Sequence, residues 1–201
     1  ALRSGRILAV KGIGGFHLMV DATNETAVRE LRRRKHREEK PLAVMFPSPE
    51  SLRAAAAATK EEVCWLTSAA APIVLVRRRP DARLAEAVAP GNPWIGALLP
   101  YSPLHVQLLQ AVGRPVVATS GNRSEEPLCT DNAEARQRLG GIADLFLVHD
   151  RSIARPVDDS VLRGAAGGAV LLRRARGFAP APFRLPAHAV ASEPLLCVGG
   201  H

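Results

Sequence analysis

The sequence predicts an α/β fold built on one twisted, partly parallel sheet that is flanked by short helices. Short apolar segments alternate along the chain with segments that begin at a helix-capping residue, and this alternation is typical of α/β folds. The 201 residues suffice for one domain, and 47% apolar and 23% charged residues are ordinary for a folded protein. These values exclude a disordered, collagen-like or coiled-coil chain. No apolar run reaches the ~18 residues that a membrane span needs, so we expect no membrane association.

The first half of the chain contains the first helix and strand candidates. Helices are expected to begin where a Ser, Thr or Asn side chain can accept a hydrogen bond from a free amide of the first turn. The predicted caps are Asn24, Ser48 before Pro49, and Thr59 with Glu62 in a capping-box spacing. Strands are expected over residues 6–10, 16–20, 41–46, 73–76 and 94–98, with a glycine-rich turn over residues 12–15.

The second half continues the alternation. One helix is expected from Ser102 to Gly113, and a short one from Asp131 to Gly140. Strands are expected over residues 115–118, 145–148, 160–163 and 169–172. Residues 180–194 are rich in Pro and Ala and indicate a linker. We expect both ends of the chain to lie inside a longer protein.

Positive charge is the strongest compositional signal. The chain has 27 Lys and Arg against 19 Asp and Glu, a formal net charge of +8. Two of its four lysines, Lys35 and Lys40, lie in the basic segment 32–40. Basic clusters usually form a solvated face, and a basic surface is also typical of proteins with a polyphosphate or nucleic-acid partner. Aromatic residues are only 4%, which leaves little for base stacking.

The three cysteines, Cys64, Cys129 and Cys197, have neither the spacing of a zinc site nor that of a disulfide framework. We therefore expect reduced cysteines in a cytoplasmic protein.

Three segments carry the candidate chemistry, since the sequence holds no P-loop and no serine-nucleophile elbow. Residues 11–17 form a glycine-rich turn, which either lets backbone amides approach a ligand or is a tight turn alone. Lys35, Arg37 and Lys40 converge at a helix end, where the helix dipole by itself favours cations. Residues 119–124 place hydroxyl and amide groups after a buried strand, as in a nucleotide crevice or in a simple polar turn.

Together these segments resemble a known family. KGIGGFHLMVDATN, RRRKHREEKPLAVMF, LPYSPLH, VVATSGNRSEEP, ADLFLVHDRSIARPVDDSVLR and LLRRARGFAP are similar, in this order, to the YrdC-like domain of the HypF carbamoyltransferases of hydrogenase maturation. The resemblance covers residues 5–186. Threonylcarbamoyl-AMP synthases and antibiotic O-carbamoyltransferases carry the same type of domain.

The resemblance implies a twisted open mixed sheet with a concave basic face, and ATP and Mg²⁺ as its ligands. The implied catalytic residues are Lys35, Arg37 and Lys40. The implied nucleotide-binding residues are Lys11, Thr119, Ser120, Asn122, Ser124, Asp158, Ser160, Arg174 and Arg176. The implied substrate residues are Gly14, Phe16 and His17. Asp158 or Asp159 is a candidate for the metal or the ribose, or a solvated loop acid, and Arg155, Arg174 and Arg176 face the phosphates or lie on the surface.

The implied activity is the formation of carbamoyl-adenylate from ATP and a carbamate derived from carbamoyl phosphate. Residues 1–187 would be the YrdC-like domain, and residues 188–201 a linker and the start of a Kae-like domain. Further implied partners are an upstream acylphosphatase-like domain and the acceptor protein HypE.

Three other functions stay open from the sequence. A basic domain of this type is alternatively a module for double-stranded RNA. A threonylcarbamoyl-AMP synthase is a second alternative, but Gly12 and Gly14 stand where that family has threonine-contacting hydroxyls. A hydrolase using Ser120, His149 and Asp158 is the weakest, because no base is placed near Ser120 by spacing.

Overall fold

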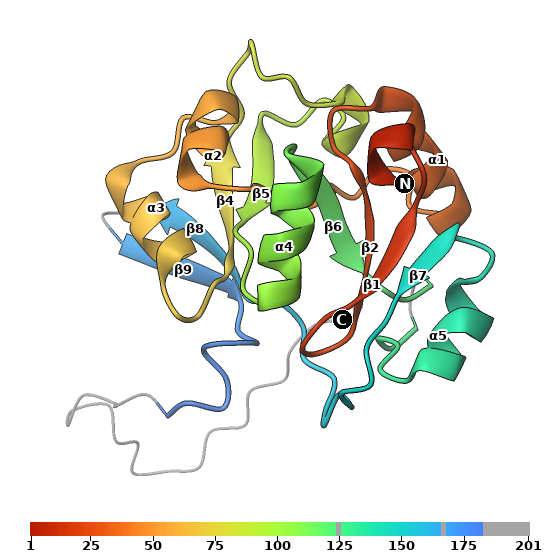
Figure 1. Cartoon of the computed structure of the whole chain (residues 1–201). Helices are drawn as coiled ribbons and strands as arrows, with labels where there is room; N and C mark the ends of the chain where they lie inside the picture. Colours follow the sequence, from red (N-terminus) through yellow and green to blue (C-terminus); the bar gives the residue numbers. More distant parts are fainter. Residues whose placement is uncertain (124–125, 166–167, 183–201) are drawn as a thin grey trace.

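The fold centres on a mixed sheet (Figure 1). The computed structural model describes residues 1–123, 126–165 and 168–182. Within these residues the sheet has nine strands in the order β7-β1-β2-β6-β3-β5-β4-β8-β9. The strands are β1 (Leu8–Lys11), β2 (Phe16–Asp21), β3 (Val44–Met45), β4 (Ile73–Arg77), β5 (Trp94–Leu98), β6 (Val116–Ser120), β7 (Leu145–Leu147), β8 (Val161–Ala165) and β9 (Gly168–Arg173). The helices are η1 (Leu2–Ser4), α1 (Glu25–Lys35), α2 (Pro49–Ala55), α3 (Lys60–Thr67), η2 (Glu86–Val88), α4 (Pro103–Val112) and α5 (Asn132–Leu139).

Strand direction confirms the predicted mixed sheet. β1 pairs with β7, β3 with β5, and β4 with β8 in parallel. The pairs β1–β2, β2–β6, β3–β6, β4–β5 and β8–β9 are antiparallel. Because β3 and β6 run in opposite directions at the centre, the residues before β3 lie beside the carboxyl end of β6.

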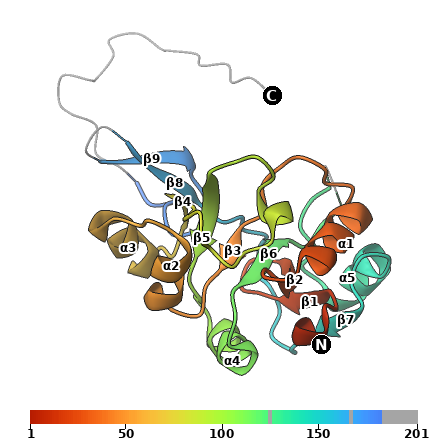
Figure 2. The ribbon, with the colours of Figure 1, turned by 90° about the horizontal axis from the view of Figure 1, so that it is seen from above.

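Apolar side chains cover both faces of the sheet, which buries the central strands. The larger cluster contains Val28 and Leu31 of α1 with Leu52 of α2. The smaller cluster packs Leu109 and Val112 of α4 on the other face. Figure 2 shows α4 on the opposite side of β1 and β2 from α1 and α5.

All five predicted helix caps are confirmed. The side chains of Asn24, Ser48, Thr59, Ser102 and Asp131 each accept a hydrogen bond from an amide in the first turn of their helix. Local chemistry decides these starts, since a cap needs only the residues that follow it.

The predicted strand over residues 41–46 is longer than the observed β3, and this part of the prediction is wrong. Leu42 donates its amide to Val88, outside the sheet, and the residues paired with both neighbouring strands are Val44 and Met45. Most of the predicted linker, and the predicted second domain over residues 188–201, lie outside the described residues. Among the described helices, none is both long and apolar enough to cross a membrane.

Candidate functional site

A cleft of about 1010 Å³ opens beside the carboxyl end of β6. Its apolar lining comes from five sheet residues and three residues before β3: Ile73, Leu75, Gly96, Ala118, Val161, Pro41, Leu42 and Ala43. A Cβ atom on Gly96 would lie 3.0 Å from Ile73 Cγ2, so glycine keeps this floor open. Its polar lining includes Lys35, Arg37, Lys40, Thr119, Ser120, Asn122, Asp158, Asp159 and Arg173. An apolar floor bordered by cationic side chains suits a ring system that carries an anionic group.

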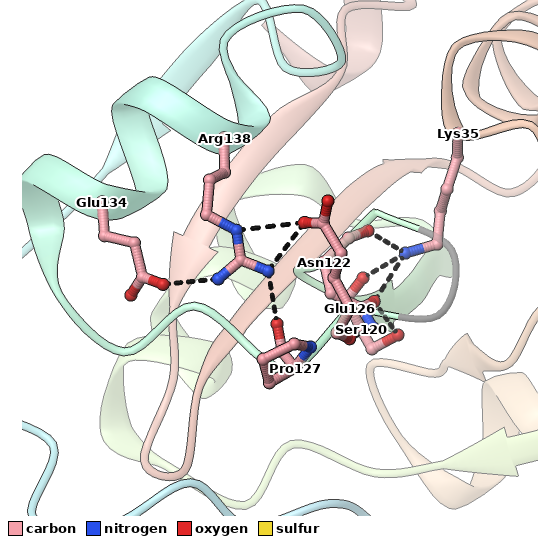
Figure 3. Close-up of polar contacts among 7 residues, drawn as sticks. All are labelled: Lys35, Ser120, Asn122, Glu126, Pro127, Glu134 and Arg138. Carbon is pink, nitrogen blue, oxygen red and sulfur yellow. Dashed lines mark hydrogen bonds and ion pairs between the residues drawn. The ribbon is translucent and has the colours of Figure 1, made fainter.

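Lys35, the last residue of α1, ties that helix to the end of β6. Its side chain is 3% exposed. The ammonium Nζ donates to the carbonyl oxygens of Ser120 at 2.6 Å and Asn122 at 2.7 Å, and to Asn122 Oδ1 at 3.0 Å (Figure 3). Burial, and next the positive charge of Arg37, lower the pKa of Lys35 to about 7. An anion that enters the cleft therefore favours the protonated form of this lysine.

Arg37 closes a tight turn at the rim of the cleft. Its guanidinium donates to the carbonyl oxygens of Pro41 at 2.8 Å and Lys40 at 3.2 Å, and to Thr119 Oγ1 at 3.4 Å. Burial, followed by the charges of Arg32 and Arg173, lowers the pKa of Arg37. Its guanidinium thus connects residues 40–41, at the rim of the cleft, to Thr119 of β6.

Arg32 connects residues 37–38, which line the cleft, to residues 87–88. Its guanidinium is buried and donates to the carbonyl oxygens of Arg37 and Glu38, both at 2.8 Å, and of Ala87 and Val88. A planar guanidinium with five donors can reach these four carbonyl oxygens at once, whereas a lysine has only three donors.

Ser120 and Asn122 form a compact polar turn after β6. Ser120 Oγ donates to Asn122 Oδ1 at 2.7 Å. Between them, Gly121 lies against Phe16, and a Cβ atom there would be 2.5 Å from Phe16 Cβ. Only glycine fits this close approach, so the turn is held at a fixed place above β2.

A second polar cluster adjoins the cleft and gathers five side chains. Asp159 Oδ1 accepts from Arg176 at 2.7 Å, and its Oδ2 lies 3.5 Å from His17 Nε2. The guanidinium of Arg176 lies 3.7 Å from the ring centre of Tyr101, and the Tyr101 hydroxyl is 3.4 Å from His17 Nε2. His105 stacks on His17 with ring centres 5.6 Å apart.

Charge in this cluster is strongly constrained. Although burial opposes ionisation of Asp159, His17 and Arg176 hold the pKa of its carboxyl well below the usual range. Burial, and next the proximity of His17, lower the pKa of His105 to about 3. Burial and the Asp159 charge raise the pKa of Tyr101. The cluster therefore holds one fixed carboxylate–guanidinium pair beside a neutral His105.

A pocket of about 20 Å³, the space of roughly one water molecule, lies between this cluster and the cleft. It is lined by Gly14, Phe16 and His17, and by Ser120, Asp158 and Asp159, which also line the cleft. Three side-chain nitrogens of the cluster have no hydrogen-bond partner among the described residues: His17 Nδ1 and both ring nitrogens of His105.

The structure brings most of the sequence-predicted site residues together. Seven of them line the cleft: Lys35, Arg37, Lys40, Thr119, Ser120, Asn122 and Asp158. Gly14, Phe16 and His17 line the small pocket, and Arg176 joins the Asp159 cluster.

Three predicted site residues lie elsewhere, and a fourth is not described. The ammonium of Lys11 donates to the His149 carbonyl oxygen at 3.1 Å. Ser160 Oγ bridges to the Arg176 carbonyl oxygen and the Ala175 amide, so it supports the chain after β9. Arg174 is exposed and donates to the Ala181 carbonyl oxygen. Ser124 lies outside the described residues.

Sequence reasoning missed Arg173, Tyr101 and His105. Arg173 is the last residue of β9 and lines the cleft, while its neighbour Arg174 does not. The two-residue period of a strand separates such neighbours, but a sequence gives no signal for which one faces the cleft. Tyr101 and His105 lie in the motif that carried the resemblance, yet only the fold brings them to His17.

Comparison with known proteins decides the family. The family model for Sua5, YciO and YrdC proteins, described as "Telomere recombination", matches residues 1–175. The chain belongs to the Sua5/YciO/YrdC family. It is 51% identical over 200 residues to the carbamoyltransferase HypF of Synechocystis, covering all of this chain and 26% of that protein. The predicted resemblance to the YrdC-like domain of HypF is therefore confirmed.

Solved structures of HypF and Sua5 have the same fold as this chain. A full-length HypF in a phosphate- and nucleotide-bound form is 46% identical with a TM-score of 0.87, covering 89% of this chain and 28% of that one. Sua5 of P. abyssi with L-threonine is 21% identical, with a TM-score of 0.77 over 87% of this chain and 52% of that one, and this likeness shows the fold alone. The chain spans about a quarter of the length of the curated HypF relatives it matches.

Proposed function

We propose that the cleft binds ATP and that the domain forms carbamoyl-adenylate, one step of carbamoyl transfer in hydrogenase maturation. The observation that carries this proposal is the convergence of Lys35, Arg37, Lys40 and Arg173 on one cleft beside the hydroxyl–amide turn 120–122. A polyphosphate needs several cations and amide donors around it, whereas an apolar floor suits a base.

The relatives support this assignment. A HypF structure at 46% identity contains phosphate and nucleotide. Curated relatives up to 51% identical are named carbamoyltransferases. This chain matches only a quarter of the length of these relatives. We therefore propose, rather than read from them, that it takes part in carbamoyl transfer. The proposed partners are carbamoyl phosphate, the flanking acylphosphatase-like and Kae-like domains and the acceptor HypE.

The proposed step needs charge neutralisation more than proton transfer. A carbamate oxygen forms a bond to the α-phosphorus of ATP while the bond from that phosphorus to the bridging oxygen of pyrophosphate breaks. Carbamate is already an anion, so no general base is required. Catalysis then rests on orientation and on cations that stabilise the charge of the transferred group. In this proposal Arg37 and Arg173, which line the cleft, contact the phosphates, and Lys35, which donates to the Ser120 carbonyl oxygen, acts on the phosphate oxygens nearest Ser120.

Asp158 fits the role of a Mg²⁺ ligand better than its neighbour. Asp158 is exposed where the cleft meets the small pocket, whereas Asp159 is engaged by Arg176 and His17. Mg²⁺ is commonly held by one or two carboxylates together with substrate phosphates, and when bound it would neutralise phosphate charge. The described residues hold no group of three or more potential metal-ligating side chains, so substrate phosphates would complete this site.

The small pocket is the proposed place for the reacting end of the carbamate. It borders the cleft at Ser120 and Asp158, so a group held there would reach the α-phosphate. His17 lines this pocket, and its buried Nδ1, which has no hydrogen-bond partner among the described residues, is the polar atom that we assign to such a substrate.

Calorimetric titration with ATP and Mg²⁺ tests the nucleotide site. Arg37→Ala removes a charge-assisted contact worth about 1.5–3 kcal/mol, so affinity should fall roughly 10- to 150-fold. The matched control is Arg53→Ala, which removes an exposed charge on α2 away from the cleft. Equal affinity of wild type and Arg37→Ala would refute the assignment. Salt-sensitive binding of duplex RNA without saturable ATP binding would favour the RNA alternative instead.

A further inference from the structure

Arg138 on α5 connects that helix to the chain that follows the 120–122 turn. Its Nε and Nη2 atoms contact Glu126 Oε2 at 3.1 and 2.8 Å, and Nη2 also donates to the Pro127 carbonyl oxygen at 2.8 Å. Its remaining nitrogen, Nη1, is ion-paired with Glu134. Figure 3 shows the guanidinium surrounded by these three residues, on the far side of Asn122 from Lys35.

Asn122 links this outer contact to the cleft. Its amide nitrogen donates to the Glu126 carbonyl oxygen at 2.6 Å. Its amide oxygen accepts from Ser120 Oγ at 2.7 Å and from Lys35 Nζ at 3.0 Å. The two ends of one amide therefore face opposite ways, and holding the nitrogen end also fixes the oxygen end.

We propose that Arg138 is a positioning residue: by fixing Glu126 and Pro127 it orients Asn122, and thereby the Ser120 hydroxyl and the Lys35 ammonium at the proposed phosphate site. This inference rests on the proposed nucleotide function of the cleft. Arg138 does not line the cleft itself, so its effect on binding is indirect.

The exposure of this ion pair indicates that Arg138 contributes more to the position of the loop than to the free energy of unfolding. Arg138 and Glu126 are partly solvated, with side chains 21% and 41% exposed. Ion pairs in such settings contribute little to folding. A guanidinium that joins a carboxylate and a carbonyl of one loop nevertheless restricts that loop, and restriction before binding lowers the cost of binding.

The test compares Arg138→Met with Arg136→Met. Both changes remove one positive charge from α5, and Arg136 is exposed on the same helix. Three quantities are measured: ATP affinity by calorimetry, the melting temperature, and the NMR signal of the Asn122 side-chain amide without nucleotide. We expect Arg138→Met to bind ATP about 3- to 10-fold more weakly, to shift or broaden the Asn122 signal, and to melt within a few degrees of wild type. Arg136→Met should match wild type in all three.

A conservative variant adds a readout that a purely structural role would not produce. Arg138→Lys retains the charge but cannot form the fork to Glu126 and Pro127, so its ATP affinity should fall between those of wild type and Arg138→Met.

Two results would overturn the proposal: wild-type ATP affinity in Arg138→Met, or an equal loss of affinity in Arg136→Met. If wild type itself fails to bind ATP, the proposed function fails, and the Asn122 signal alone judges the loop. An unchanged Asn122 signal in Arg138→Met would then refute the positioning role.

Discussion

The amide of Gly121 donates a hydrogen bond to the carbonyl oxygen of Phe16, and the two atoms are 2.6 Å apart. This contact joins the polar turn after β6 to the first residue of β2. Cys129 completes the arrangement, because its amide donates to the Gly121 carbonyl oxygen and its own carbonyl oxygen accepts from the Phe16 amide. The turn that carries Ser120 and Asn122 is thus set by main-chain contacts between three distant segments.

Gly121→Ala should destabilise the protein strongly. The new Cβ would lie 2.5 Å from both Cβ and O of Phe16, so the backbone of one segment has to move. We expect a loss of at least about 2 kcal/mol in the free energy of unfolding, measured by urea denaturation. The control is Gly141→Ala, where a Cβ would meet nothing within 4 Å. Equal stability of the two variants would contradict the assigned role of Gly121.

Arg32→Met should also destabilise the protein, through unpaired carbonyls. The buried guanidinium donates to main-chain oxygens of the two segments 37–38 and 87–88. The Val88 oxygen also accepts from the Leu42 amide, but the other three lose this hydrogen bond, and each buried oxygen left unpaired costs about 1–3 kcal/mol. Urea denaturation should show the loss. Arg33→Met, on the same helix but with an exposed ion pair to Glu30, should change stability little. The interpretation fails if Arg32→Met is as stable as Arg33→Met.

ATP binding at pH 8 should take up protons. A lysine whose pKa is about 7 is largely neutral at pH 8, and a bound polyphosphate favours its protonated form. The binding enthalpy should therefore differ between Hepes and Tris, which have different ionisation enthalpies. Lys35→Met should bind more weakly and lose most of this buffer dependence. The same enthalpy in both buffers would show that Lys35 keeps its charge state on binding.

L-Threonine should not stimulate pyrophosphate release from ATP and bicarbonate. Gly12 and Gly14 carry no hydroxyl, and Cβ atoms there would lie 2.8 Å from Gly15 O and 2.6 Å from Val157 O. No side chain fits at either position to contact the threonine. Pyrophosphate release that rises strongly with added threonine would place this chain with the threonylcarbamoyl-AMP synthases instead.

Local chemistry explains what could be predicted from the sequence. The caps at Asn24 and Ser102 depend on a few neighbouring residues, and they are found where predicted. The basic element at Lys35 and Arg37 and the turn at Ser120 were predicted to share a site, and they line one cleft. Their grouping came from the resemblance, because no spacing rule joins segments more than 80 residues apart.

Tertiary packing decides what could not be predicted. Lys11 occurs in a candidate motif, but its ammonium reaches the His149 carbonyl oxygen rather than the cleft. Asp159 and Arg176 form a half-buried pair that contacts His17 of β2 and Tyr101. Such contacts depend on how distant segments pack, which the sequence pattern does not contain.

The exchange of labelled pyrophosphate into ATP tests the central claim most directly, because adenylate formation is reversible. The protein is incubated with ATP, Mg²⁺, labelled pyrophosphate and ammonium carbamate, with bicarbonate alone as the control. The account predicts exchange that depends on carbamate and that is lost in Arg37→Ala but kept in Arg53→Ala. Absence of carbamate-dependent exchange in a protein that binds ATP would contradict it.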